Sequence, residues 1–144
     1  MVKAFIKKQK KLFVCLLIVA FIAVFFGIDF CIAKTYKMEV QAMSEEIVYA
    51  DNKKPVEIDI ALTRFGKPVE KHNLYAVAEG GGRLKANRVR TDENGVASFV
   101  YVPYTSNRFM PAAPITIRII DESNSIFFEV NAEYSFVIDL VEKE

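Results

Sequence analysis

The chain has 144 residues, of which 52% are hydrophobic, and its formal net charge is +1 at pH 7. This length accommodates one domain with a short appendage. The charge is uneven, because five lysines lie within residues 1–11 whereas the residues after Ala33 hold 14 Lys and Arg against 17 Asp and Glu. A mildly acidic domain argues against nucleic-acid binding, so we expect no nucleic-acid partner.

Residues 12–33 are predicted to form a transmembrane signal-anchor helix. Leu12 to Ile28 carries no charge, and four apolar residues follow Asp29. As a helix the segment is about 33 Å long, which suits a hydrocarbon core of about 30 Å. The preceding basic segment, residues 1–11, predicts a cytoplasmic N-terminus by the positive-inside rule. The lysines nearest the helix are Lys7, Lys8, Lys10 and Lys11. We therefore expect a single-pass cell-membrane protein whose C-terminal domain lies outside the cytoplasm.

A cleaved signal peptide is the main alternative to an uncleaved anchor. Cys31-Ile32-Ala33 loosely resembles a cleavage site, but the apolar run exceeds the roughly 7 to 15 residues of a signal peptide's apolar region. A lipoprotein is disfavoured because no small residue precedes Cys15 or Cys31. The glycine and glutamate that mark a type IV prepilin are missing between Lys11 and Leu16. Both cysteines lie in the helix, so the domain has no internal disulfide, which suits a bacterial envelope.

Asp29 is the one charged residue inside the predicted span. It lies about 25 Å along the helix from Leu12, which brings it to the outer headgroup region. We expect its carboxylate to touch water there. Pairing with a basic residue on a partner helix is the alternative.

The rest of the chain alternates apolar and polar residues with a period of two, which is typical of strands. Residues 34–50 are predicted to be a linker with a candidate first strand, and residues 51–144 an all-β, immunoglobulin-like two-sheet sandwich. The last strand is expected to be the longest, and Phe127, Val137 and Val141 on its polar face indicate a neighbour there. The clearest alternating runs are 56–62, 74–78, 96–102, 115–119 and 128–140.

Several segments resemble the bacterial immunoglobulin-like domains of the intimin and invasin adhesins. They are Ile58 to Thr63, the turn Gly66-Lys67-Pro68-Val69, the triplet Gly80-Gly81-Gly82, and the run from Thr91 to Phe99. The resemblance covers about residues 56–102, and the same turn pattern recurs in carboxypeptidase-regulatory-like and transthyretin-like modules. It implies structural spacing or adhesion rather than catalysis. The chain departs from the adhesins in having one domain rather than a tandem array, and an N-terminal anchor.

Two clusters in the domain are candidate partner-binding sites. The first is basic and consists of Arg83, Lys85, Arg88 and Arg90. It is either a patch for an anionic partner or a charged edge strand that opposes aggregation. The second contains Tyr104, Phe109 and Met110, near Tyr101 and Arg108, before the loop Pro111–Pro114. These side chains either form an apolar contact patch or close the end of the sandwich.

No catalytic constellation, metal site or cofactor site is expected, so the chain is predicted not to be an enzyme. His72 is the only histidine, and we interpret it as a solvated loop residue rather than a metal ligand. Asp92, Glu93 and Asn94 contain calcium-type ligands, but the turn at Asn94-Gly95 already explains that pattern.

The leading functional hypothesis is a non-enzymatic, membrane-anchored accessory or scaffold subunit of a bacterial cell-envelope assembly of the secretion, pilus or conjugation type. Its helix and its domain would both make protein–protein contacts. The alternative is a surface binding module for cell-wall polysaccharide or another extracellular ligand. The expected partners are the lipid bilayer and other membrane or envelope proteins, with a second copy of the chain among the candidates.

Overall fold

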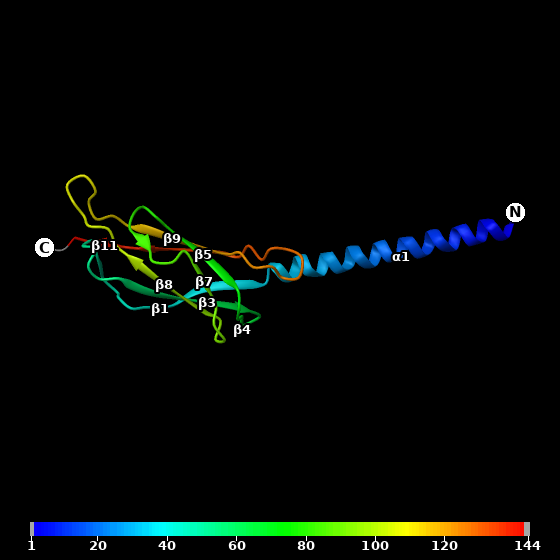
Figure 1. Cartoon of the computed structure of the whole chain (residues 1–144), viewed down its shortest axis with the longest axis horizontal. Coiled ribbons are helices and arrows are strands. Elements are labelled where there is room, and N and C mark those ends of the chain that lie inside the picture. Colours follow the sequence, from blue (N-terminus) through cyan, green and yellow to red (C-terminus); the bar gives the residue numbers. More distant parts are fainter. Residues whose placement is uncertain (1, 143–144) are drawn as a thin grey trace.

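The computed structural model describes residues 2–142, with side chains from residue 11 onward. A long helix, α1 (Val2–Ala33), leads into an elongated β domain whose strands run roughly along the helix direction (Figure 1). Lys11–Ala33 is long and apolar enough to cross a membrane. Most of its side chains are exposed, as Phe21 is at 73%, whereas Asp29 and Ala33 are buried. The helix ends where the Thr35 hydroxyl donates to the carbonyl of Ile32 at 2.7 Å.

The β domain consists of two antiparallel sheets and a short third one. The first sheet has the order β1-β3-β8-β6, and the short strand β4 also pairs with β3. The second sheet has the order β10-β9-β5-β7. A parallel pair, β2 and β11, lies at the end of the domain farthest from α1 (Figure 1). The strands are β1 (Tyr36–Met43), β2 (Val48–Tyr49), β3 (Val56–Arg64), β4 (Lys67–Pro68), β5 (Asn73–Glu79), β6 (Arg83–Leu84), β7 (Arg88–Arg90), β8 (Val96–Val102), β9 (Ile115–Asp121), β10 (Glu133–Ile138) and β11 (Leu140–Val141).

The core lies between the two large sheets, as the alternating pattern predicts. Every second residue of β3 points inward, and every second residue of β9 does so from the opposite sheet. This burial of one face per sheet is the main source of stability in a sandwich. The predicted all-β, two-sheet sandwich preceded by one N-terminal apolar helix is confirmed. Side chains that are at most 1% exposed include Val56, Ile58, Ile60, Leu62, Leu74, Ala76, Phe99, Tyr101, Ile115, Ile117 and Ile119.

Residues 34–50 contain more regular structure than the expected linker. Only Lys34 and Thr35 separate α1 from β1, which pairs with β3 from Tyr36↔Arg64 to Met43↔Ile58. β1 is therefore the candidate first strand, and it lies at an edge of the first sheet. The helix and the sandwich are joined by a turn of two residues.

The last strand differs from the prediction. Residues 128–140 were expected to form one long strand, but β10 begins only at Glu133 and ends at Ile138. Residues 123–130 form a loop that reaches back toward α1, and we call it the anchor loop (Figure 1). Its apolar residues follow a strand-like alternation because they pack against the helix and the sandwich rather than in a sheet.

The tight turn before β8 forms where Asn94-Gly95 predicts it. Gly95 has φ of 73°, and an added Cβ would approach the carbonyl oxygen of Leu62 and the nitrogen of Val69 to 2.7 Å. Only glycine satisfies both constraints. One Asp92 carboxylate oxygen accepts hydrogen bonds from the backbone N–H groups of Asn94 and Val96. The acidic residue thus serves the turn itself.

Candidate functional site

The junction of α1 with the anchor loop is centred on Asp29, which is only 1% exposed. One carboxylate oxygen accepts hydrogen bonds from the Ser125 hydroxyl and from the Ile126 N–H at 3.1 Å. The other oxygen accepts from the N–H groups of Phe127 and Phe128, at 2.8 and 3.2 Å. A single carboxylate therefore satisfies four donors of a segment that follows it by almost 100 residues.

The anchor loop is also closed by its own backbone. The Ser125 N–H donates to the Phe128 carbonyl at 2.8 Å, and the Val130 N–H donates to the Ser123 carbonyl at the same distance. The Ser123 hydroxyl accepts from the Asn73 N–H at 2.7 Å, which ties the start of the loop to β5. The loop is thus fixed to the sandwich at its base and to the helix at its tip.

Aromatic contacts between α1 and the anchor loop accompany the hydrogen bonds of Asp29. The Phe127 ring lies 5.9 Å from the Phe25 ring and 5.3 Å from the Phe26 ring, between ring centres. The Phe128 ring lies 5.9 Å from the rings of both Phe26 and Phe30. Positions three and four apart are neighbours on a helix, so Phe25 and Phe26 share one face with Asp29, and Phe30 lies next to Phe26.

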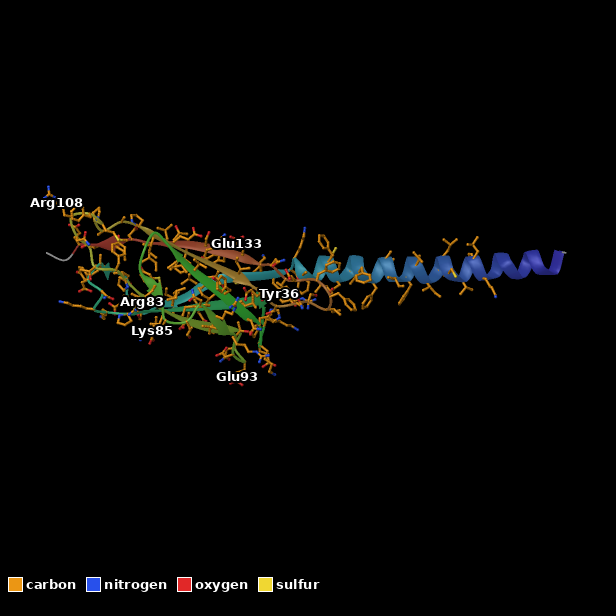
Figure 2. All side chains as sticks on the ribbon, turned by 45° about the horizontal axis from the view of Figure 1, so that its top comes forward. Tyr36, Arg83, Lys85, Glu93, Arg108 and Glu133 are labelled. Carbon is orange, nitrogen blue, oxygen red and sulfur yellow. The ribbon has the colours of Figure 1, made fainter. Side chains whose placement is uncertain are left out.

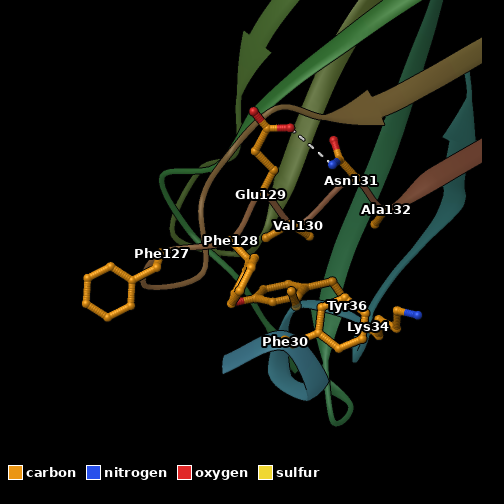
Figure 3. Close-up of a pocket in the computed structure, with 10 residues that line it drawn as sticks. Phe30, Lys34, Tyr36, Phe127, Phe128, Glu129, Val130, Asn131 and Ala132 are labelled. Atoms are coloured by element: carbon orange, nitrogen blue, oxygen red, sulfur yellow. Dashed lines mark hydrogen bonds between the residues drawn. The ribbon is translucent and has the colours of Figure 1, made fainter. Parts of the chain in front are cut away.

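A groove of about 640 Å³ lies beside this junction (Figure 3). Its apolar side includes Phe30, Tyr36 and Phe128, and its polar rim includes Glu129 and Asn131. The Asn131 amide donates to the Glu129 carboxylate at 3.1 Å. The Lys34 ammonium lies 4.5 Å from the centre of the Phe30 ring, which is a cation–π contact. Charged and amide groups therefore border the junction on the side of the domain.

These contacts correct the expectations for Asp29 and Phe127. The expected contact of Asp29 with water is wrong, because its side chain is buried by the anchor loop. Its partners are backbone N–H groups and a hydroxyl of the same chain rather than a basic residue of a partner helix. The neighbour indicated by Phe127 is the chain's own helix. Val137 and Val141 remain 60% and 44% exposed.

His72 differs from the expected solvated loop residue. Its side chain is 13% exposed, and its Nδ1 lies 2.6 Å from a carboxylate oxygen of Asp121, which is fully buried. The other oxygen of Asp121 accepts from the Ser123 N–H at 2.9 Å. The His72 ring also lies 5.1 Å from the Tyr36 ring. This pair joins the start of β5 to the end of β9 and to the base of the anchor loop.

The predicted basic cluster is divided between the two sheets. Arg83 lies on β6 and Lys85 just beyond it, whereas Arg88 and Arg90 form the ends of β7 in the opposite sheet. Both β6 and β7 are edge strands, which is the arrangement in which charges oppose aggregation. All four side chains are exposed, and Figure 2 marks Arg83 and Lys85. As a site for an anionic ligand, this cluster stays a prediction.

Arg88 already has an acidic partner. Its guanidinium donates to the Glu122 carboxylate at 2.8 Å and lies 5.0 Å from the Tyr75 ring centre. The hydrogen bond to Arg88 lowers the pKa of Glu122 below its usual value, and the same bond raises the pKa of Arg88. The Arg90 guanidinium donates to the Lys71 carbonyl at 3.2 Å. These contacts hold both side chains against the domain.

The second predicted cluster is split between the interior and the surface. Tyr101 is fully buried, its hydroxyl donates to the Gly81 carbonyl at 3.1 Å, and burial raises its pKa to about 12. The Tyr104 hydroxyl donates to the Pro111 carbonyl at 2.8 Å and accepts from the Ala113 N–H. Phe109 is 95% exposed and Met110 is 39% exposed. The loop that carries them projects at the end farthest from α1, where Figure 2 marks Arg108.

Of the four lysines predicted to lie beside the membrane, Lys11 is exposed at the start of the apolar span. The side chains of Lys7, Lys8 and Lys10 lie outside the described residues. Among residues 11–142, no group of three or more His, Cys, Asp or Glu is arranged to hold a metal ion.

No protein-family model matches the chain, and no curated protein matches it significantly. Among solved structures, the D00-D0 domain of intimin aligns with a TM-score of 0.53 and 12% identity, covering 76% of this chain and 49% of that one. The C-terminal 282-residue fragment of intimin, in complex with the intimin-binding domain of the translocated intimin receptor, aligns with a TM-score of 0.52 and 15% identity. The alignment covers 71% of this chain and 32% of that fragment.

A conjugative transposon lipoprotein from Bacteroides eggerthii aligns with a TM-score of 0.45 and 15% identity, over 72% of this chain and 95% of that one. By contrast, the chain spans less than half the length of the two intimin fragments described above. At such identities the likeness concerns the fold, and the predicted resemblance to the immunoglobulin-like domains of intimin is confirmed at that level.

Proposed function

We propose that the chain is a non-enzymatic, membrane-anchored accessory subunit of a bacterial cell-envelope assembly. In this proposal α1 crosses the membrane with its lysine-rich end in the cytoplasm. The sandwich stands outside the cytoplasm at a fixed height and orientation. Its end farthest from the membrane contacts other envelope proteins. Secretion, pilus and conjugation machines are the assemblies in which such a subunit would work.

The observation that carries the proposal is the double attachment of the sandwich to α1. The chain passes from helix to β1 through two residues, and the anchor loop returns to hydrogen-bond Asp29. A module that captures soluble ligands at the cell surface gains reach from a long flexible tether. A subunit that must meet its partners at one height gains from a stiff connection, because fewer orientations are lost on binding. The attachment therefore favours an assembly subunit over a tethered binding module.

The end of the sandwich farthest from α1 offers the surface for such partners. Phe109 and Met110 project there, and the Ser106 N–H donates to the Ala50 carbonyl at 2.8 Å, which fixes this loop beside β2. Val141, in the neighbouring β11, is 44% exposed, as part of the same end of the domain. Exposed aromatic and methionine side chains on a held loop are typical of protein–protein contact sites.

Site-specific photocross-linking in cells tests this proposal. A photoreactive phenylalanine analogue replaces Phe109, and a matched variant carries it at Phe65, which is 74% exposed in the β3–β4 turn. We expect discrete adducts of higher mass from position 109 and none of those adducts from position 65. Only monomer from position 109, or the same adducts from both positions, would contradict the proposed contact surface.

A further inference from the structure

The tip of the anchor loop is apolar and exposed although it lies beside the apolar span of α1. Ile126 and Phe127 are 56% and 59% exposed, and the four residues from Ser125 to Phe128 carry no charge. The Phe127 ring touches the rings of Phe25 and Phe26, so it lies at their level along the helix.

The depth of this level follows from helix geometry. A hydrocarbon core of about 30 Å that starts at Lys11 ends about 20 residues later, near Cys31. Phe26 then lies about 7 Å inside the outer edge of that core. Phe127, which packs on Phe26, lies at a similar depth. The charged residues Lys34 and Glu129 lie on the domain side of the junction (Figure 3), where headgroups and water would meet them.

Non-helical backbone enters lipid only where its polar groups are satisfied within the protein, since each unpaired group costs several kcal/mol. The N–H groups at the tip of the anchor loop meet this condition. The N–H groups of Ile126, Phe127 and Phe128 all donate to Asp29, and the Ser125 N–H donates to the Phe128 carbonyl. The Asp29 carboxylate is stabilised in return. A charge inside the membrane lacks water, and the four hydrogen-bond donors of the loop take the place of that water. The loop and Asp29 satisfy each other.

We propose that the tip of the anchor loop, Ile126 with Phe127, inserts among the acyl chains of the outer leaflet alongside α1. This inference rests on the proposed transmembrane placement of the helix. The inserted tip adds apolar area to the anchor on one side of the helix only. It thereby fixes which face of the sandwich is turned toward the membrane, in the manner of an interfacial wedge.

Tryptophan fluorescence provides the test, because the chain has no tryptophan of its own. Single variants Phe127→Trp, Leu17→Trp and Phe109→Trp of the full chain are reconstituted in phosphatidylcholine vesicles, with or without brominated acyl chains. We expect brominated lipid to remove most of the emission of Phe127→Trp, as it does for Leu17→Trp in the helix. Aqueous iodide should quench Phe109→Trp, at the far end of the domain, and leave Phe127→Trp nearly unchanged.

Three other outcomes of the quenching experiment would each contradict the insertion for a different reason. Quenching of Phe127→Trp by iodide as strong as that of Phe109→Trp would overturn the insertion while Leu17→Trp remains quenched by brominated lipid. Shielding of Phe127→Trp from both quenchers would overturn it in favour of a second copy of the chain covering the tip. If brominated lipid left Leu17→Trp unquenched, the transmembrane placement in the proposed function would fail, and the insertion with it.

Discussion

Replacing Asp29 with alanine is expected to release the anchor loop from α1. The Ser125 hydroxyl and the N–H groups of Ile126, Phe127 and Phe128 would lose their common acceptor. An unpaired buried donor is costly, so the loop should open far more often. Amide hydrogen exchange of the full chain in nanodiscs should show residues 126–128 exchanging roughly 10- to 100-fold faster.

The core of the sandwich should be unaffected by that change. The amides of Ile117 and Ile119, in the middle of β9, should keep their protection because they lie in the buried sheet. Asp139→Ala removes an exposed carboxylate and serves as the matched control, with exchange of the anchor loop unchanged. Equal exchange rates at residues 126–128 in the parent chain and in Asp29→Ala would mean that the carboxylate does not hold the loop.

Replacing Asp121 with alanine is expected to destabilise the sandwich itself. Asp121 is fully buried, and its carboxylate meets the His72 ring at 2.6 Å and the Ser123 N–H at 2.9 Å. Its removal leaves both groups without that acceptor and leaves a cavity behind. We expect the free energy of unfolding to fall by about 3 kcal/mol, measured by urea denaturation of the full chain in mild detergent.

Two substitutions at His72 separate hydrogen bonding from simple packing. His72→Asn keeps an N–H donor near the position of Nδ1, so it should retain most of the stability that His72→Leu loses. The Asp121 carboxylate also accepts a hydrogen bond from the Ser123 N–H at the base of the anchor loop. Asp121→Ala should therefore speed amide exchange in residues 126–128 as well, in addition to lowering stability. Equal stability of His72→Asn and His72→Leu would show that the ring acts only through its volume.

The strands that bury one face in the core of the sandwich were predictable from the local sequence pattern alone. In β3, β8 and β9 the residues at every second position are the buried ones, so period and burial agree. The parity of the alternation changes between Lys85 and Arg88, a pattern that is also typical of a bulge. In the structure the chain leaves the first sheet after β6 and enters the second at β7. Period alone does not distinguish a bulge from a change of sheet.

The junction of α1 with the anchor loop could not be predicted from the local sequence pattern. The segment from Phe128 to Ala132 alternates like a strand, yet its apolar residues serve contacts with α1 and with the sandwich. The partner of Asp29 lies 96 or more residues away, and the partner of His72 lies 49 residues away. A carboxylate inside an apolar span indicates a buried partner, but the sequence contains no spacing rule that identifies uncharged backbone N–H groups as that partner.

A stiff connection between helix and sandwich is the physical claim on which the proposed function depends, and a distance distribution measures it directly. Spin labels at Leu17→Cys on α1 and Val137→Cys on β10, in a chain with Cys15→Ser and Cys31→Ser, are compared by pulsed electron paramagnetic resonance in nanodiscs. Both label sites are exposed in the structure. One narrow distance peak is expected, broadened by Asp29→Ala. A broad distribution of label distances that is the same with and without Asp29 would contradict the claim. It would indicate a sandwich that is freely tethered to the helix.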